Sequence, residues 1–159
     1  MVRRLFLTVA ACVTFAGCGG TPPVEGAPAT VVEAFNQAVT RQDAEAALAH
    51  LADGGVQYQL RSSHADMGES TGLTADLNGQ WTVVTSLLFQ SLESYARTVE
   101  VTEESERGEI ATVWTTTRTE SLEKGASSPS VLEFSEVYLL LEVDGTWKIA
   151  GMANNRPTT

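Results

Sequence analysis

Cysteine and histidine, the side chains that most often act as nucleophiles or metal ligands, are scarce in this chain. The 159 residues contain two of each, which are Cys12, Cys18, His50 and His64. His64 precedes Asp66 by two positions, and this pair could supply two ligands to a metal ion. A zinc or iron site needs at least three protein ligands held rigidly. We therefore expect no metal and no cofactor, with His64 and Asp66 in a polar loop and His50 on the solvated side of a helix.

The surroundings of Cys18 predict covalent attachment rather than catalysis. Arg3 and Arg4 precede a short apolar run that ends in Ala16-Gly17-Cys18. This is the pattern of an export signal, and the run is well short of the ~20 residues that cross a bilayer. The site resembles a bacterial lipobox, in which Cys18 is acylated, with palmitate for example, and becomes the mature N-terminus. The segment 9–12 also fits, but cleavage there would leave a very short signal.

This interpretation divides the chain into four parts. They are a signal peptide over 1–17, a flexible Gly-, Pro- and Ala-rich tether over 18–29, one folded domain over 30–153 and a tail over 154–159. We expect an exported lipoprotein, held at the membrane by its lipid. Gly19 after the cysteine indicates the periplasmic side of the outer membrane if the cell has two membranes.

The charge of the chain excludes nucleic acid as a partner. The full sequence has 10 Lys and Arg against 20 Asp and Glu, a net charge of −10. Removal of Arg3 and Arg4 with the signal leaves 8 basic residues against the same 20 acidic ones, a net charge of −12. A domain of this kind repels polyanions. With one remaining cysteine it has no internal disulfide, so its stability depends on its core.

Apolar periodicity predicts three helices. Thr30-Val31-Val32-Glu33 fits a capping box at the start of the first, and the apolar residues behind it recur at helical spacing. Asp43 caps a short second helix, which Asp53-Gly54-Gly55 is expected to end. Apolar residues return at helical spacing over about 80–95, which predicts the third.

Alternation and turn signals predict the strands. Residues 56–60 alternate strictly and 61–79 form a long polar loop. Four further strands are predicted over roughly 97–104, 109–120, 131–143 and 146–152. Asp144-Gly145 is a close hairpin signal. Helices followed by hairpin strands indicate an α+β domain, with three helices packed on one side of a curved antiparallel sheet.

Three segments together resemble the nuclear transport factor 2-like, or SnoaL-like, superfamily. They are Thr30-Val-Val-Glu-Ala-Phe-Asn-Gln-Ala-Val39, Asp43 through Leu51-Ala-Asp-Gly54, and Val143-Asp-Gly-Thr-Trp-Lys-Ile-Ala150. The resemblance covers about 30–153 and implies a cone, in which helices close one side of a strongly curved sheet and leave a pocket. Members include isomerases, cyclases, dehydratases, transport adaptors, secretion-system parts and lipoproteins, so the fold does not fix an activity.

The resemblance also locates the positions that carry catalysis in members similar to ketosteroid isomerase. Those members combine a carboxylate base, a tyrosine and a protonated aspartate. The matching positions fall near Gln59, at Phe35, and near Val137 or Tyr138. No carboxylate stands at these positions, and Phe35 lacks a hydroxyl. The resemblance therefore implies that this particular chemistry is absent.

Aromatic side chains and one arginine are the candidates for a ligand pocket on the concave side of the sheet. The candidates are Tyr58, Trp81, Trp114, Arg118, Phe134 and Tyr138. Apolar clefts with a few polar groups are the usual ligand sites, and the alternative is that these aromatics fill the core.

The predicted strand over 109–120 carries a threonine-rich face. Trp114, Thr116 and Arg118 share this face, which would be a half-wet pocket wall or a pairing surface for a second copy. Glutamates of the following strand, Glu133 and Glu136, are predicted to be solvated at a sheet edge, as is Glu142.

Three roles remain open at this point. We expect first a lipid-anchored envelope protein that binds a small apolar ligand or a protein partner without catalysis. The alternative is a SnoaL-like enzyme of the isomerase or dehydratase type with a non-standard active site, in which Tyr58, Arg118 or Asp66 would take part. A third is a structural module, which forms a homodimer or docks on an envelope complex through the open face of its sheet.

Overall fold

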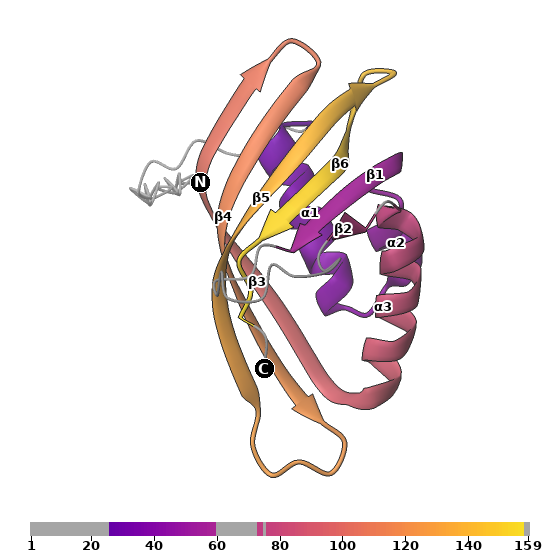
Figure 1. The fold of residues 1–159 in the computed structure, drawn as a ribbon, viewed down its shortest axis with the longest axis vertical. Coiled ribbons are helices and arrows are strands. Elements are labelled where there is room, and N and C mark those ends of the chain that lie inside the picture. The colour runs from indigo at the N-terminus through magenta and orange to yellow at the C-terminus, as the bar shows by residue number, and fades with distance from the viewer. Residues whose placement is uncertain (1–25, 60–72, 75, 158–159) are drawn as a thin grey trace, which may run out of the picture.

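A computed structural model describes residues 26–59, 73–74 and 76–157. Their elements are, in chain order, α1 (Pro28–Thr40), α2 (Ala44–Leu48), β1 (Leu51–Gln59), β2 (Leu73–Thr74), α3 (Leu77–Ser91), β3 (Leu92–Arg107), β4 (Ile110–Glu123), β5 (Ser130–Val143) and β6 (Thr146–Asn154) (Figure 1). The predicted signal, the lipid site at Cys18, and the loop residues His64 and Asp66 lie outside the described residues. None of the described helices has the length and apolar character needed to span a membrane.

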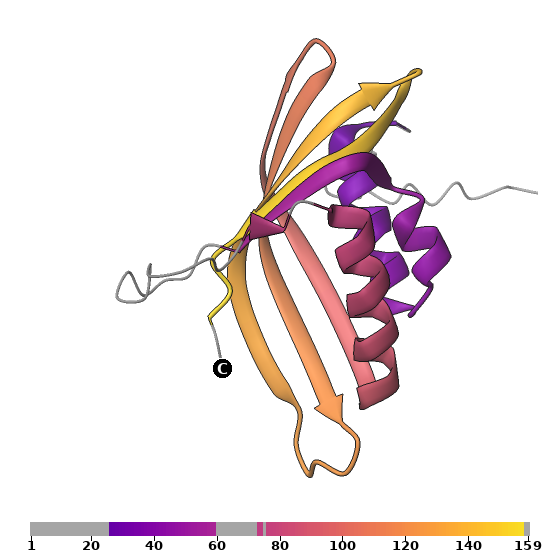
Figure 2. The same cartoon turned by 45° about the vertical axis from the view of Figure 1, so that its right-hand side comes forward.

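The strands form one curved sheet in the order β2-β1-β6-β5-β4-β3. Neighbours pair antiparallel except β1 and β6, which pair in parallel. All three helices lie against one face of this sheet, as Figures 1 and 2 show. We call this the inner face and the opposite one the outer face. The α+β architecture predicted from the sequence is confirmed, with one parallel pair in an otherwise antiparallel sheet.

Helix α1 begins two residues before the predicted cap. Pro28 stands in its first turn, where the missing N–H of proline removes no hydrogen bond, and no side chain caps the start. Thr30 therefore lies inside the helix, and its buried hydroxyl has no hydrogen-bond partner in the part of the chain that the structure describes. The capping box at Thr30 and Glu33 is wrong. The cap at Asp43 is confirmed, because its carboxylate accepts a hydrogen bond from the Ala46 N–H at 3.0 Å.

The Asp53-Gly54-Gly55 segment lies inside β1 and does not end a helix. Helix α2 has already ended at Leu48, and the pairing of β1 with β6 shifts between Leu51 and Val56. Gly54 has a φ of 74° there, a conformation that is strained for residues with a side chain. The glycine signal thus marks an irregularity in the strand rather than a helix end.

The change from α3 to β3 comes at Ser91, earlier than the predicted end at about residue 95. Leu92 and Tyr95 continue the helical spacing of apolar residues, yet both belong to β3. Strand β3 pairs with β4 over its whole length, with one shift near Leu92 and one after Val101. These ladder hydrogen bonds outweigh the local periodicity, and they place Tyr95 on the inner face.

The hydrophobic core lies between the helices and the inner face of the sheet. Phe35 of α1 is fully buried at its centre. Its ring meets Trp81 of α3 edge-to-face, with centroids 5.0 Å apart, and lies 6.5 Å from the ring of Tyr138 on β5. These contacts pack α1 and α3 against the sheet, and they position the buried polar side chains that are described below.

Candidate functional site

A cluster of polar side chains lies within this core, on the inner face. We call it the inner polar cluster, and it comprises Asn36, Arg97, Thr117, Glu136, Tyr138 and Asn154. None of the six is more than 7% exposed, and they come from α1 and from strands β3 to β6. Polar groups are tolerated at such depth when they satisfy one another's hydrogen bonds.

The centre of the cluster is a buried ion pair between Arg97 and Glu136. Arg97 Nη2 contacts Glu136 Oε2, and the two side chains are 4% and 1% exposed. Arg97 Nε also donates to Asn36 Oδ1. Burial alone would lower the pKa of Arg97, but the charge of Glu136, together with Tyr138, raises it above its ordinary range. Arg97 is therefore a permanent cation that Glu136 compensates.

Both oxygens of the Glu136 carboxylate are bonded. Oε1 accepts from Asn154 Nδ2 at 3.1 Å. Oε2 accepts from the Tyr138 hydroxyl at 2.5 Å and from the Thr117 hydroxyl at 3.4 Å, in addition to Arg97. A general base must offer a lone pair to the proton that it removes. Glu136 would have to give up one of these bonds before it could do so.

The Tyr138 hydroxyl connects this carboxylate to helix α1. It donates to Glu136 and lies 3.1 Å from Asn36 Nδ2 and 3.3 Å from Arg97 Nη2, which can both donate to it. Burial raises the pKa of Tyr138, as does the neighbouring Glu136, while Arg97 partly offsets this rise. The phenol consequently stays protonated at physiological pH and serves as a fixed donor.

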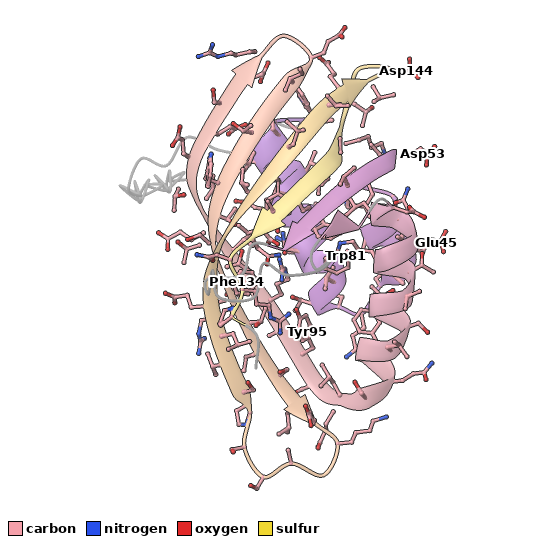
Figure 3. The ribbon with its side chains drawn as sticks, in the orientation of Figure 1. Glu45, Asp53, Trp81, Tyr95, Phe134 and Asp144 are labelled. Atoms are coloured by element: carbon pink, nitrogen blue, oxygen red, sulfur yellow. The ribbon has the colours of Figure 1, made fainter. Side chains whose placement is uncertain are left out.

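One buried donor near the cluster has no acceptor. Trp81 is 6% exposed, and its Nε1–H makes no hydrogen bond to any of the described residues. Figure 3 shows Trp81 and Tyr95 in the space between α3 and the sheet. Leaving a buried donor unpaired costs roughly 1–3 kcal/mol, so such a group in a native core calls for an explanation.

The segment after β6 brings a second arginine to the rim of the inner face. The guanidinium carbon of Arg156 lies 5.8 Å from the centroid of the Phe134 ring, and that of Arg97 lies 5.6 Å from the same centroid. The Arg156 N–H donates to Asn154 Oδ1 at 3.3 Å. Asn154 thus joins Glu136 of the cluster to the backbone of Arg156.

The predicted pocket residues are divided between the two faces of the sheet. Trp81, Phe134 and Tyr138 are buried on the inner side. Trp114 and Arg118 lie on the outer face, where Trp114 is 46% exposed. Trp114 and Arg118 therefore do not lie on the concave side with the other three, because side chains alternate along β4 and the buried positions there are Thr115, Thr117 and Thr119.

Tyr58, the sixth candidate, is described by its backbone alone. It lies in β1 and pairs with Leu73 and Ala153. The position near Gln59 is in the same part of β1, and its side chain also lies outside the description. Their part in a site stays a prediction.

The prediction that Glu136 is solvated is wrong, because its side chain is only 2% exposed. Glu133 is exposed, as predicted. The signal was present, because Glu136 alternates in phase with Phe134, Tyr138 and Leu140 on the buried side of β5. Arg97 on β3 carries the same signal, because it stands two positions after the buried Tyr95 and so shares its face of the strand. The sequence feature that indicates the cluster is a single charged residue that alternates in step with buried apolar residues along a strand.

His50 is not a solvated helix residue as predicted. It follows the end of α2 and is half-buried, and its carbonyl accepts from the Ile149 N–H at 2.9 Å. Burial and the nearby Lys148 lower the pKa of His50. Within the described ranges no three His, Cys, Asp or Glu side chains are grouped so that they could hold a metal ion.

A hollow of about 390 Å³ lies at the end of β6, where the outward-facing Thr116 and Ser135 meet the segment that follows the strand. It is lined by Thr116, Glu133, Phe134, Ser135, Asn155 and Pro157. The hollow is open and its lining is mostly polar, in contrast to the enclosed, mainly apolar pockets that hold small ligands.

Solved structures share this fold at low sequence identity. A ketosteroid isomerase-like protein from Erwinia carotovora atroseptica is 17% identical, with a TM-score of 0.66 over 88% of this chain and 100% of that chain. A candidate scytalone dehydratase from Novosphingobium aromaticivorans is 11% identical, with a TM-score of 0.65 over 83% of each chain. An NTF2-like protein from Shewanella baltica is 14% identical, with a TM-score of 0.54 over 83% of this chain and 92% of that chain.

The sequence by itself finds no such relatives. No family model matches it. No curated protein matches it either. What this chain shares with solved structures is therefore the arrangement of helices around a curved sheet, at sequence identities below 20%. By that arrangement, the chain has the nuclear transport factor 2-like, or SnoaL-like, α+β fold.

Proposed function

We propose that this is a lipid-anchored envelope protein whose domain binds a small, mainly apolar ligand on the inner face of its sheet and does not transform it. The observation that carries the proposal is the unpaired Nε1–H of Trp81, buried beside Phe35 in an aromatic layer. A ligand oxygen that accepts this hydrogen bond would remove the energetic cost of the unpaired donor. Aromatic rings around one available donor are typical of ligand sites.

The bonding of the inner polar cluster supports binding over catalysis. Proton transfer needs a group that can exchange its proton with the substrate. Glu136 is held by four donors, and the raised pKa of Tyr138 opposes loss of its proton. Phe35, at the position where the isomerase-like members have a tyrosine, packs on Trp81 and offers no hydroxyl. In our proposal the cluster is a rigid floor for the ligand.

The membrane attachment in this proposal rests on the sequence around Cys18. Acylation there would hold the domain at the membrane through the tether 18–29, on the periplasmic side of the outer membrane in a two-membrane cell. An acidic domain with a net charge of −12 after loss of the signal would be repelled by anionic head groups, so the lipid supplies the attachment.

The test is calorimetric titration of the full chain, held in lipid nanodiscs, with 1-naphthalenemethanol, which combines an aromatic body with one hydroxyl. We expect saturable binding that empty nanodiscs lack. Trp81→Phe keeps an aromatic side chain, although a smaller one, and removes the donor, and it should weaken binding about tenfold, the effect of one lost hydrogen bond. Trp114→Phe makes the same change on the outer face and should leave binding unchanged. Absence of binding, or equal effects of both variants, would contradict the proposal.

A second candidate role, self-association through the outer face, is favoured by a separate observation. Ile110 and Trp114 of β4 and Leu139 of β5 are 50%, 46% and 42% exposed on that face. The register pairs Ile110 with Leu141 and Trp114 with Val137, so the apolar side chains adjoin across the two strands. Contiguous exposed apolar surface of this kind marks interaction sites.

A further inference from the structure

We infer that the ligand of the inner face carries a carboxylate, which the guanidinium of Arg156 binds at the rim of that face. This inference rests on the proposed binding function and adds the charge of the ligand to it. It starts from the ion pairs among the described residues, in which Arg97 and Arg118 each have an acidic partner and Arg156 has none.

The charge of Arg156 is uncompensated within the described part of the chain. Arg97 is neutralised by Glu136, and Arg118 lies 3.5 Å from Glu120. No carboxylate of the described residues lies within ion-pair distance of Arg156. Among the other arginines of the described residues, Arg41 and Arg107 also have no ion pair, but both are exposed to water, whereas Arg156 is half-buried.

The position of Arg156 is fixed by hydrogen bonds on the residues before it. Asn154 accepts from the Arg156 N–H at 3.3 Å and donates to Glu136 at 3.1 Å. Asn155 accepts from the Ser135 N–H at 2.9 Å through its side chain, and its own N–H donates to the Ser135 carbonyl at 3.3 Å. A guanidinium whose backbone is held in place loses less entropy when it binds an anion.

The surroundings of Arg156 favour an anion attached to an apolar body. Its guanidinium lies over Phe134, which is 6% exposed on the inner face. Partial desolvation over an aromatic ring strengthens a contact with a carboxylate, because less water competes for the guanidinium. Of the two glutamates on the neighbouring part of β5, the carboxylate of Glu136 is neutralised by Arg97, and Glu133 is exposed to water. Neither is a free buried charge that would oppose an incoming anion at the rim.

Arginine is also the side chain that best matches a carboxylate in shape. Its planar fork can donate two parallel hydrogen bonds to the two oxygens, and such charge-assisted bonds are about twice as strong as neutral ones. With the carboxylate at Arg156, the apolar body of the ligand would extend along the inner face toward the aromatic layer of Trp81 and Phe35.

The experiment compares three probes with one naphthalene body, which are 1-naphthoate, 1-naphthalenemethanol and 1-naphthylmethylamine. Each is titrated by calorimetry into the full chain in nanodiscs, with empty nanodiscs as the blank. We expect 1-naphthoate to bind about tenfold more tightly than the alcohol, and the amine to bind more weakly than either. Arg156→Gln should abolish the preference for the acid and leave the alcohol unchanged. Arg118→Gln removes the same charge from the outer face and should alter none of the three affinities.

The outcomes separate this inference from the function on which it rests. Binding of the alcohol without a preference for the acid overturns the carboxylate inference alone. The same conclusion follows if Arg156→Gln and Arg118→Gln reduce the preference equally, because the effect would then be one of overall charge. If none of the three probes binds, the proposed function and the inference fail together. A circular dichroism melt of each variant shows that it is folded before it is titrated.

Discussion

The inner and outer faces of strands β4 and β5 differ in burial and in the charges that they carry, although their residues alternate along the same strands. Glu133 and Glu136 stand three positions apart on β5. Glu133 is exposed to water, whereas Glu136 is 2% exposed and holds four hydrogen-bond donors. The outer face carries the apolar Trp114 in solvent, and the inner face carries an ion pair in the core. The face of a strand, and not the type of residue, decides what each side chain does.

The burial of charges on the inner face and the exposure of apolar side chains on the outer face have energetic consequences. A buried ion pair contributes little net stability, because removing two charges from water offsets their attraction. It is nevertheless costly to break, because the remaining charge is left without a partner. An exposed apolar side chain has the opposite balance, since it contributes little to folding and is available to another surface. The inner face should therefore be sensitive to single substitutions and the outer face tolerant.

The largest effect expected is that of Glu136→Gln. The substitution keeps the size of the side chain but leaves Arg97 as an uncompensated buried cation, and it should lower the free energy of unfolding by about 3–5 kcal/mol. Glu133→Gln makes the same change on the outer side and should stay within about 0.5 kcal/mol. Urea unfolding of both variants, followed by circular dichroism, measures the difference. Equal effects would contradict the contrast between the two faces.

A double substitution sharpens that test. Replacing both members of the pair, as Arg97→Met with Glu136→Leu, removes the unpaired charge as well as the pair. Apolar replacement of a whole buried ion pair is often neutral or stabilising. The double variant should therefore be more stable than Glu136→Gln. A double variant as unstable as the single one would show that hydrogen bonding by the cluster, and not charge balance, dominates.

A smaller effect is expected from Tyr138→Phe, which removes the hydroxyl between Glu136 and Asn36. The loss should be about 1–3 kcal/mol near pH 7. Because the folded-state pKa of Tyr138 is raised above its ordinary value of 10.0, its contribution is complete below pH 10 and is lost as the pH rises further. Urea unfolding of both proteins between pH 7 and pH 11 should therefore show their difference shrinking above pH 10. A difference that stays constant across this range would contradict the raised pKa.

The smallest effect on folding is expected from Trp114→Thr on the outer face. Threonine suits a strand, so the free energy of unfolding should change by less than about 0.5 kcal/mol. If the outer face forms a homodimer, the same substitution should weaken self-association, measured by analytical ultracentrifugation over a range of concentrations. Leu87→Thr is the control, because Leu87 is 63% exposed on α3, away from the outer face. Equal association of wild type and both variants would exclude this surface as the interface.

The elements were predicted well wherever local chemistry alone decides them. Asp43 caps α2 as predicted because an N-cap needs only its own helix, and Asp144-Gly145 turns a hairpin because both residues adopt positive φ. The boundaries failed where distant pairing competes. The helical spacing of Leu92 and Tyr95 yields to the ladder with β4, and Gly54 serves the pairing of β1 with β6.

The site was predicted less well, because its parts are far apart in the sequence. Trp81, Phe134 and Tyr138 were proposed as pocket residues and do lie on the inner side. Arg97 and Glu136, which occupy the centre, were not singled out, since neither has its partner nearby in the chain. Their contact requires β3 and β5 to be joined through β4, with all three strands in register.

The sequence by itself determined the order of the three helices and the five longer strands, the α+β class, the acidic charge and the lipobox-like segment at Cys18, because each depends on neighbouring residues or on composition. Only the tertiary structure decided which face of each strand is covered. The helices cover the face that bears Tyr138, and this choice buries the charges of Arg97 and Glu136 against each other while Trp114 and Arg118 remain in water. A period-2 pattern shows which residues share a face, but burial depends on what packs against that face, and that packing comes from α1 and α3, far away along the chain.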